Sequence, residues 1–362
     1  MNRSKRLIIT AVLLLSGAPL GLAEPTAPTL NAADAAQQNV EIQKLLRQYR
    51  AAGTTAEQKA TIVGQLLEIG SLGPQQLAVN VERDFSSKAP AYLTKFEKSA
   101  KDALRAAWKG QGDIEKEVQR LRATVLDVSH TADLTKERIV SKADPAMKRL
   151  EELLTTDPAK VQAFAADLKT QRQELVDMVD VWHKAADRVP EPLRKKLTPL
   201  PPSDVFENVL TGNEQLASLM ATPMTPADRS VLIGNLTLAK SLDPEEGKGV
   251  LILNMMRIRL GLRANAIDLK LCEAGRGHSS DMKERKFFDH ASPVPGKATP
   301  WDRAKLAGST ADAENIFMGS PSGASAIEAW WHSPGHHKNM IADHHRTGLG
   351  RTDTHWTQMF GD

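Results

Sequence analysis

Residues 32–189 consist almost wholly of helix-forming amino acids, which restricts this part of the chain to an all-α structure. Alanine, leucine, lysine, glutamate and glutamine predominate, and apolar residues recur at helical spacing, as in Val118, Leu121 and Val125. Aromatic residues are scarce and no heptad pattern is sustained. The pattern therefore predicts an antiparallel helical bundle or a bent, coiled-coil-like region rather than one unbroken rod.

Local signals divide this region into several helices. An aspartate followed by proline, typical of a helix cap before the first helical position, occurs at Asp144 and again at Asp157. The helical pattern is interrupted at residues 110–112, where two glycines flank a glutamine, and around residues 131–133. These breaks are consistent with helices that reverse direction and pack side by side.

Two further segments connect the helical region to the C-terminus. Residues 190–203 carry five prolines and predict a stiff, extended linker. Residues 204–242 resume a helical pattern and predict a helical connector. Asp243, followed by a proline and two glutamates, then predicts the first helix of a last domain at residues 243–362.

The N-terminus is typical of an export signal. Residues 1–23 begin with basic side chains, continue in the apolar run Leu7–Leu15 and end in small residues before Glu24. The apolar run is too short to span a bilayer as a stable anchor, although an uncleaved signal anchor is the alternative interpretation. Residues 24–31 are rich in proline, alanine and threonine and predict a disordered linker. We therefore expect a secreted or periplasmic protein with no later membrane span.

Charge and cysteine content limit which classes of partner and which stabilising interactions we expect. The chain has 47 basic and 44 acidic residues, and Arg3, Lys5 and Arg6 lie in the predicted signal. Removing them leaves basic and acidic residues equal in number, so neither nucleic acid nor an acidic membrane surface is an expected partner. Cys272 is the only cysteine, so an intramolecular disulfide is excluded and Cys272 itself is expected to be a small buried side chain.

Histidines are concentrated near the C-terminus. Eight of the ten lie between His278 and His355. Three short strings in this part of the chain carry most of the information: His278–Met282, Ala313–Ile316 and Trp330–His336. Imidazole and carboxylate groups are the usual metal ligands and proton carriers near neutral pH, so their concentration predicts a polar functional site here.

The order and spacing of these strings resemble the CAP superfamily (cysteine-rich secretory proteins, antigen 5, pathogenesis-related 1), also called the SCP domain, in its bacterial, disulfide-free form. The resemblance covers residues 243–362 and implies an α-β-α sandwich of α+β class with a small antiparallel sheet. It also implies a cleft with two histidines and two acidic residues, which places His290, Glu314 and His336 in the site. The fourth, acidic position falls on Ser333, so this chain keeps only two imidazoles and one carboxylate of that set.

Residue chemistry leaves the role of this set open. Two imidazoles and a carboxylate are suited to Zn²⁺ or another divalent ion, with His290 and His336 as ligands. They are equally suited to an acid/base cluster in which Glu314 fixes an imidazole tautomer, or to structural roles as helix caps and loop anchors. His278 is expected either beside the cleft or buried on its own helix. His344 is expected on the surface.

Three functions follow as expectations. The first is a non-enzymatic exported CAP protein that binds a metal ion or a small, apolar or lipid ligand in the cleft, with the helical region as spacer or protein-binding arm; the lipid ligand is implied by the resemblance alone. The second is a metal-dependent hydrolase acting on an envelope polymer or peptide, with Glu314 as general base. In the third, the helical region carries the function and the CAP domain is accessory. We favour the first and assign no catalytic residue.

Overall fold

The computed structural model describes most of the helical region and the whole C-terminal domain, at residues 32–108, 113–155, 157–201 and 222–362. The predicted signal (1–23), the linker that follows it (24–31), the end of the proline-rich linker (202–203) and the first part of the predicted connector (204–221) lie outside the described residues. None of the described helices combines the length and apolar character that a bilayer span requires.

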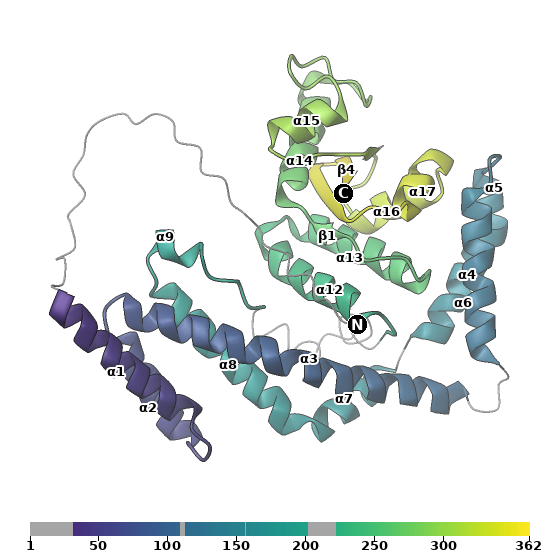
Figure 1. The fold of residues 1–362 in the computed structure, drawn as a ribbon. Helices are drawn as coiled ribbons and strands as arrows, with labels where there is room; N and C mark the ends of the chain where they lie inside the picture. The colour runs from purple at the N-terminus through teal and green to yellow at the C-terminus, as the bar shows by residue number, and fades with distance from the viewer. Residues whose placement is uncertain (1–31, 109–112, 156, 202–221) are drawn as a thin grey trace, which may run out of the picture.

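Five helices of the N-terminal region share one apolar core (Figure 1). They are α1 (Ala32–Arg50), α2 (Ala56–Leu67), α3 (Leu72–Trp108), α7 (Pro158–Asp167) and α8 (Lys169–Asp187). The short α9 (Glu191–Arg194) follows, and α12 (Pro226–Leu238), continued by the 3-10 turn η2 (Ala239–Ser241), leads to the C-terminal domain. Leu232 of α12 and Ile258 of the C-terminal domain join the same core. The predicted helical bundle is confirmed for this part of the chain.

A helical hairpin leaves the bundle between α3 and α7. It consists of α4 (Ile114–His130), the one-turn α5 (Lys136–Arg138), the π-helical η1 (Ile139–Ala143) and α6 (Asp144–Leu154). Its apolar residues do not join the bundle core but pack with residues of the C-terminal domain. The helices of residues 32–189 therefore pack in two separate apolar cores, one within the bundle and one shared with the C-terminal domain.

Polar contacts, one of them fully buried, join the hairpin to the C-terminal domain. Ser129 Oγ lies 2.7 Å from His337 Nε2, and both residues are fully buried. Asp144 accepts a hydrogen bond from Trp331 Nε1 at 2.8 Å and pairs with His332 Nε2 at 2.9 Å. Figure 1 shows α4 and α6 side by side, along the flank of the C-terminal domain.

The helix cap predicted at Asp144 does not form. The π-helical η1 runs directly into α6, so Asp144 lies inside a continuous helical path and its carboxylate is engaged by the C-terminal domain instead. The second Asp-Pro signal behaves as predicted, because Asp157 accepts from the Ala159 backbone N–H at 2.9 Å and caps α7.

The C-terminal domain is an α-β-α sandwich, as predicted. Its elements are α13 (Pro244–Arg259), β1 (Ala266–Ile267), α14 (Leu269–Arg285), α15 (Pro300–Leu306), β2 (Ala313–Met318), α16 (Gly323–Trp331), α17 (Pro334–Ile341), β3 (Arg346–Thr352) and β4 (His355–Gly361). The sheet order is β1-β3-β4-β2. The three longer strands are antiparallel, but the two-residue β1 pairs parallel with β3, so the sheet is mixed rather than purely antiparallel.

Helix α14 lies directly on the sheet because glycines at the contact let the backbones meet. A Cβ on Gly350 would fall 2.0 Å from the Arg276 backbone nitrogen, and one on Gly348 would fall 2.3 Å from that of Cys272. Cys272 is fully buried at this contact, as expected, and burial raises the pKa of its thiol to about 12. The opposite face of the sheet packs on α13, α16 and α17.

Candidate functional site

A buried ion pair forms the base of the site. Glu314, near the start of β2, and Arg303, on α15, expose 2% and 1% of their side chains and meet at 2.6 Å through Arg303 Nη2 and Glu314 Oε2. Arg303 also donates to the carbonyls of Lys297 at 2.9 Å and His290 at 3.0 Å. One guanidinium thus holds the carboxylate and both ends of the loop between α14 and α15.

The other Glu314 oxygen positions His290. His290 Nδ1 lies 2.8 Å from Glu314 Oε1, so Nδ1 carries the proton that it donates to the carboxylate. In the neutral ring, Nε2 is then an unprotonated acceptor. The hydrogen bond to Glu314 raises the pKa of His290, whose side chain is half exposed. Glu314 therefore fixes the tautomer and orientation of His290, one of the roles considered from the sequence.

His336 faces His290 from the first turn of α17. The two ring centroids lie 6.3 Å apart with the ring planes at 53°. Burial lowers the pKa of His336, and the neighbouring His290 lowers it further. The structure therefore brings together all three residues predicted for the site, with His336 favoured in its neutral form.

Three amides that the sequence reasoning missed hold α17 against β2. Asn315 Nδ2 donates to the His336 carbonyl at 3.3 Å and to Gln358 Oε1 at 3.0 Å. Asn339 Nδ2 donates to Asn315 Oδ1 at 2.8 Å and to the Glu314 carbonyl at 3.3 Å. Asn315 adjoins Glu314 in the sequence, and this adjacency could have marked it as a site residue. Arg303 was also missed, and nothing in the sequence marks it, because only the fold brings it to Glu314.

A cleft of about 470 Å³ opens beside His290 and Glu314. Its wall includes Trp301, whose residue surface is 58% exposed and therefore available to a ligand. The remaining lining residues are Asp289, Ala291, Ala298, Thr299, Pro300, Asp312, Ala313 and Asn339. His336, which was expected in the cleft, faces His290 but is not among the residues that line this cleft. Ser333, the departure from the family pattern, supplies no carboxylate; its carbonyl accepts from the His337 backbone N–H at 2.7 Å, at the start of α17.

The other histidines have structural surroundings. His278 is fully buried, and its Nε2 lies 3.0 Å from the Asp289 carbonyl, so it braces the loop that carries His290 without lining the cleft. His344 is buried against Phe360, so the expectation of a surface position was wrong. This stacking leaves no local signal in the sequence, because the partner comes from the distant strand β4.

Lowering the pH from 7 to 5 is expected to destabilise the protein, in part through His278. Burial lowers the pKa of His278 below its ordinary 6.5, so the unfolded chain binds a proton where the folded chain does not. This contribution to stability is complete above pH 6.5 and is lost below it, by up to about 1.4 kcal/mol per pH unit. Urea unfolding at both pH values should give a smaller pH effect for His278→Gln than for the wild type; equal effects would exclude this role.

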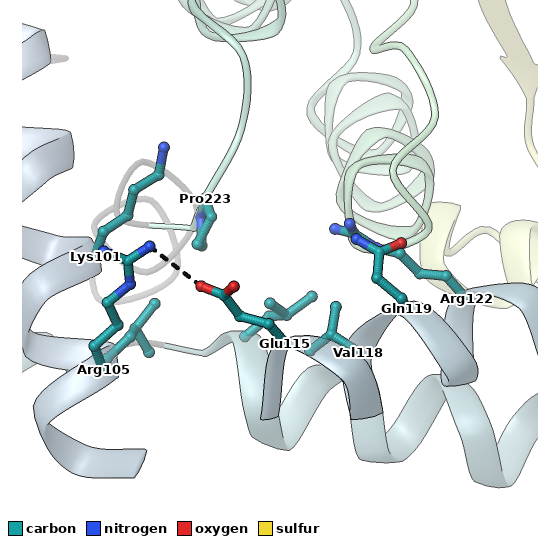
Figure 2. A pocket seen from close by; sticks show the side chains of 9 residues that line it. Lys101, Arg105, Glu115, Val118, Gln119, Arg122 and Pro223 are labelled. Atoms are coloured by element: carbon teal, nitrogen blue, oxygen red, sulfur yellow. Dashed lines mark hydrogen bonds and ion pairs between the residues drawn. The ribbon is translucent and has the colours of Figure 1, made fainter. Parts of the chain in front are cut away.

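A separate hollow of about 260 Å³ lies where α3 meets α4 (Figure 2). Figure 2 shows Arg105 of α3 paired with Glu115 of α4. Arg105 Nη2 and Glu115 Oε1 lie 3.1 Å apart, and both side chains are largely exposed. Arg122 in its wall donates to the Arg259 carbonyl at 2.8 Å. Its charged groups are thus engaged with the protein, and we assign it no function.

Comparison with known proteins identifies the C-terminal domain. Residues 252–360 match the model of the cysteine-rich secretory protein family, CAP. The chain therefore carries a CAP domain, also called an SCP domain, in its C-terminal third, and the resemblance stated from the sequence is confirmed.

Two curated relatives each match about a third of the chain. The uncharacterized protein YkwD of Bacillus subtilis (strain 168) is 34% identical over 125 residues, which are 33% of this chain and 48% of that protein. The uncharacterized membrane protein YlbC of the same strain is 31% identical over 123 residues, 33% of this chain and 36% of that protein. The chain thus spans less than half the length of these two curated relatives.

Two solved structures are also similar to part of the chain. One is an extracellular protein containing an SCP domain from Bacillus anthracis str. Ames, with 28% identity and a TM-score of 0.31, covering 41% of this chain and 49% of that one. The other is an outer surface protein from Borrelia burgdorferi, with 20% identity and a TM-score of 0.28, covering 33% of this chain and 96% of that one.

Proposed function

We propose that the CAP domain is a binding module that holds a divalent metal ion, Zn²⁺ by the chemistry of its donors, between His290 and His336. The observation that carries this proposal is the chain of contacts from Arg303 through Glu314 to His290, which leaves His290 Nε2 unprotonated. A carboxylate that orients a histidine in this way is the usual arrangement behind a metal-bound imidazole. The remaining coordination positions would be open to water or to a small ligand in the cleft.

The spacing of the two rings supports this donor pair. Two imidazoles on one tetrahedral Zn²⁺, with Zn–N bonds of about 2.1 Å, place their ring centroids roughly 5 Å apart. The observed 6.3 Å therefore requires an approach of about 1 Å.

The same geometry favours binding over hydrolysis. A general base needs a carboxylate oxygen that is free to take a proton from water. Both Glu314 oxygens are engaged, one by Arg303 at 2.6 Å and one by His290 at 2.8 Å. Glu314 is thus suited to positioning His290, and the hydrolase is the weaker of the two proposals.

The location of the module, its organic ligand and the role of the helical bundle are proposed from the sequence and the cleft. Residues 1–23 support export to the periplasm or the cell exterior. The exposed ring of Trp301 suits a ligand with an apolar face, which keeps a small apolar or lipid molecule as the organic ligand class. The bundle that contains α1 to α3 extends away from the cleft and suits a spacer or protein-binding arm (Figure 1).

Calorimetric titration of Zn²⁺ into the purified protein tests the metal site. We expect saturable binding that weakens at least ~10-fold in His290→Ala and in His336→Ala, because each removes a ligand. His130→Ala is the matched control, since this histidine is exposed in the last turn of α4. Unchanged affinity in both His290→Ala and His336→Ala, or an equal loss in His130→Ala, would refute the proposal.

A further inference from the structure

A second set of metal-binding side chains meets at the end of the sheet. Asp312 immediately precedes β2, His344 lies between α17 and β3, and Asp362 follows β4. One ring nitrogen of His344 and one carboxylate oxygen from each aspartate all lie within 4.8 Å of one another. Within the described part of the chain, no other set of three His, Cys, Asp or Glu donors converges this closely.

His344 is held rigidly and lacks a hydrogen bond that a buried imidazole needs. It is 9% exposed, and its ring stacks on Phe360 with centroids 4.9 Å apart. Arg257 fixes the turn before it by donating to the carbonyls of Met340 at 2.7 Å and Ala342 at 2.8 Å. Among the described residues, His344 Nε2 is buried without a hydrogen-bond partner. A buried ring nitrogen without a hydrogen-bond partner reduces the stability of the fold unless a ligand satisfies it.

The two carboxylates are placed by backbone contacts. Asp312 donates its N–H to the Phe360 carbonyl at 2.8 Å. Asp362 Oδ1 accepts from the His345 backbone N–H at 3.3 Å, and Arg346 donates to the main-chain oxygen of Asp362. Two carboxylates this close repel each other unless a cation lies between them. Both are exposed, so an ion can reach them from solvent.

We infer that Asp312, His344 and Asp362 form a second divalent-metal site that ties the ends of β2 and β4 to the segment entering β3. One imidazole with two carboxylates suits Zn²⁺ or Mn²⁺ better than Mg²⁺ or Ca²⁺, which prefer oxygen ligands alone. Water would complete the coordination. The site shares no ligand with the His290/His336 pair, although Asp312 also lines the cleft. It therefore does not depend on the proposed function.

The test uses the protein with both His290→Ala and His336→Ala, so that the cleft pair is absent. Calorimetric titration of ZnCl₂ should still give about one bound ion per chain, and thermal melts should show a higher Tm with ZnCl₂ than with EDTA. Adding Asp312→Asn or Asp362→Asn should weaken this binding at least ~10-fold and remove the Tm difference. Both changes preserve side-chain shape at exposed positions, and circular dichroism checks that each variant is folded.

Asp343→Asn is the matched control. Asp343 adjoins His344, its side chain is 80% exposed, and its carboxylate lies 3.9 Å from Arg263. Zn²⁺ binding and the Tm difference should be unchanged by this substitution. No binding in the double-alanine protein, or an equal loss in Asp343→Asn, would overturn the inference. Neither result bears on the cleft proposal, which stands or falls on the single His290 and His336 variants.

Discussion

Replacing Arg303 with methionine is expected to destabilise the protein by about 3–5 kcal/mol, because it leaves the Glu314 carboxylate buried without its charge partner. Glu314 and Arg303 expose 2% and 1% of their side chains, so water cannot replace the lost guanidinium without a rearrangement. The loop anchored through the His290 and Lys297 carbonyls also loses its hydrogen bonds. Urea unfolding of the purified variant gives the measurement.

A double-mutant cycle separates the charge effect from lost packing. Glu314→Gln removes the buried charge, so Arg303→Met should cost less in that background than in the wild type. A cost below about 1 kcal/mol for Arg303→Met alone would show that the ion pair does not hold the site together. Equal costs in both backgrounds would assign the loss to packing rather than to charge.

Gly350→Ala is expected to cost about 3 kcal/mol or more, because the new methyl group would overlap the backbone of α14. The added Cβ would lie 2.0 Å from the Arg276 nitrogen and 2.5 Å from the Gly275 carbonyl carbon. These are backbone atoms of a packed helix, so relief requires α14 to move off the sheet. Because His278 on α14 braces the loop that carries His290, we also expect Zn²⁺ to bind more weakly at the proposed His290/His336 site.

Gly277→Ala is the matched control on the same helix. An added Cβ there meets nothing within 4 Å. Alanine is favoured over glycine inside a helix, so this variant should be more stable by about 0.5–1 kcal/mol. Comparison of thermal unfolding in the two variants isolates the close approach at Gly350. If Gly350→Ala unfolds at the wild-type temperature, the helix-to-sheet contact is looser than described.

The fold class was predictable where local patterns decide it. Helical periodicity identified the helical region, and the ordered strings from His278 to His336 identified the CAP domain. The docking of the hairpin was not predictable, because it depends on single contacts between distant segments, such as Ser129 with His337. The strand β1, whose parallel pairing makes the sheet mixed, was not predicted, since two residues carry too little pattern to define a strand or its pairing.

The residues that meet at the site were predictable, but the residues that support them were not. His290, Glu314 and His336 were placed by resemblance to the family, and the structure brings them together. Arg303 escaped notice because an arginine on a short helix is ordinarily solvated, and nothing local distinguishes one that is 2% exposed. His344 was misjudged for a similar reason: its segment is polar, but the side chain is buried against Phe360 of the distant strand β4.

The most direct test of the cleft proposal is anomalous X-ray diffraction at the zinc edge, from crystals grown with Zn²⁺. The expected result is a peak about 2.1 Å from His290 Nε2 and from a ring nitrogen of His336, with Glu314 still bonded to His290 Nδ1. A saturated crystal with no peak between these two histidines would contradict the proposal, whatever is bound at Asp312, His344 and Asp362.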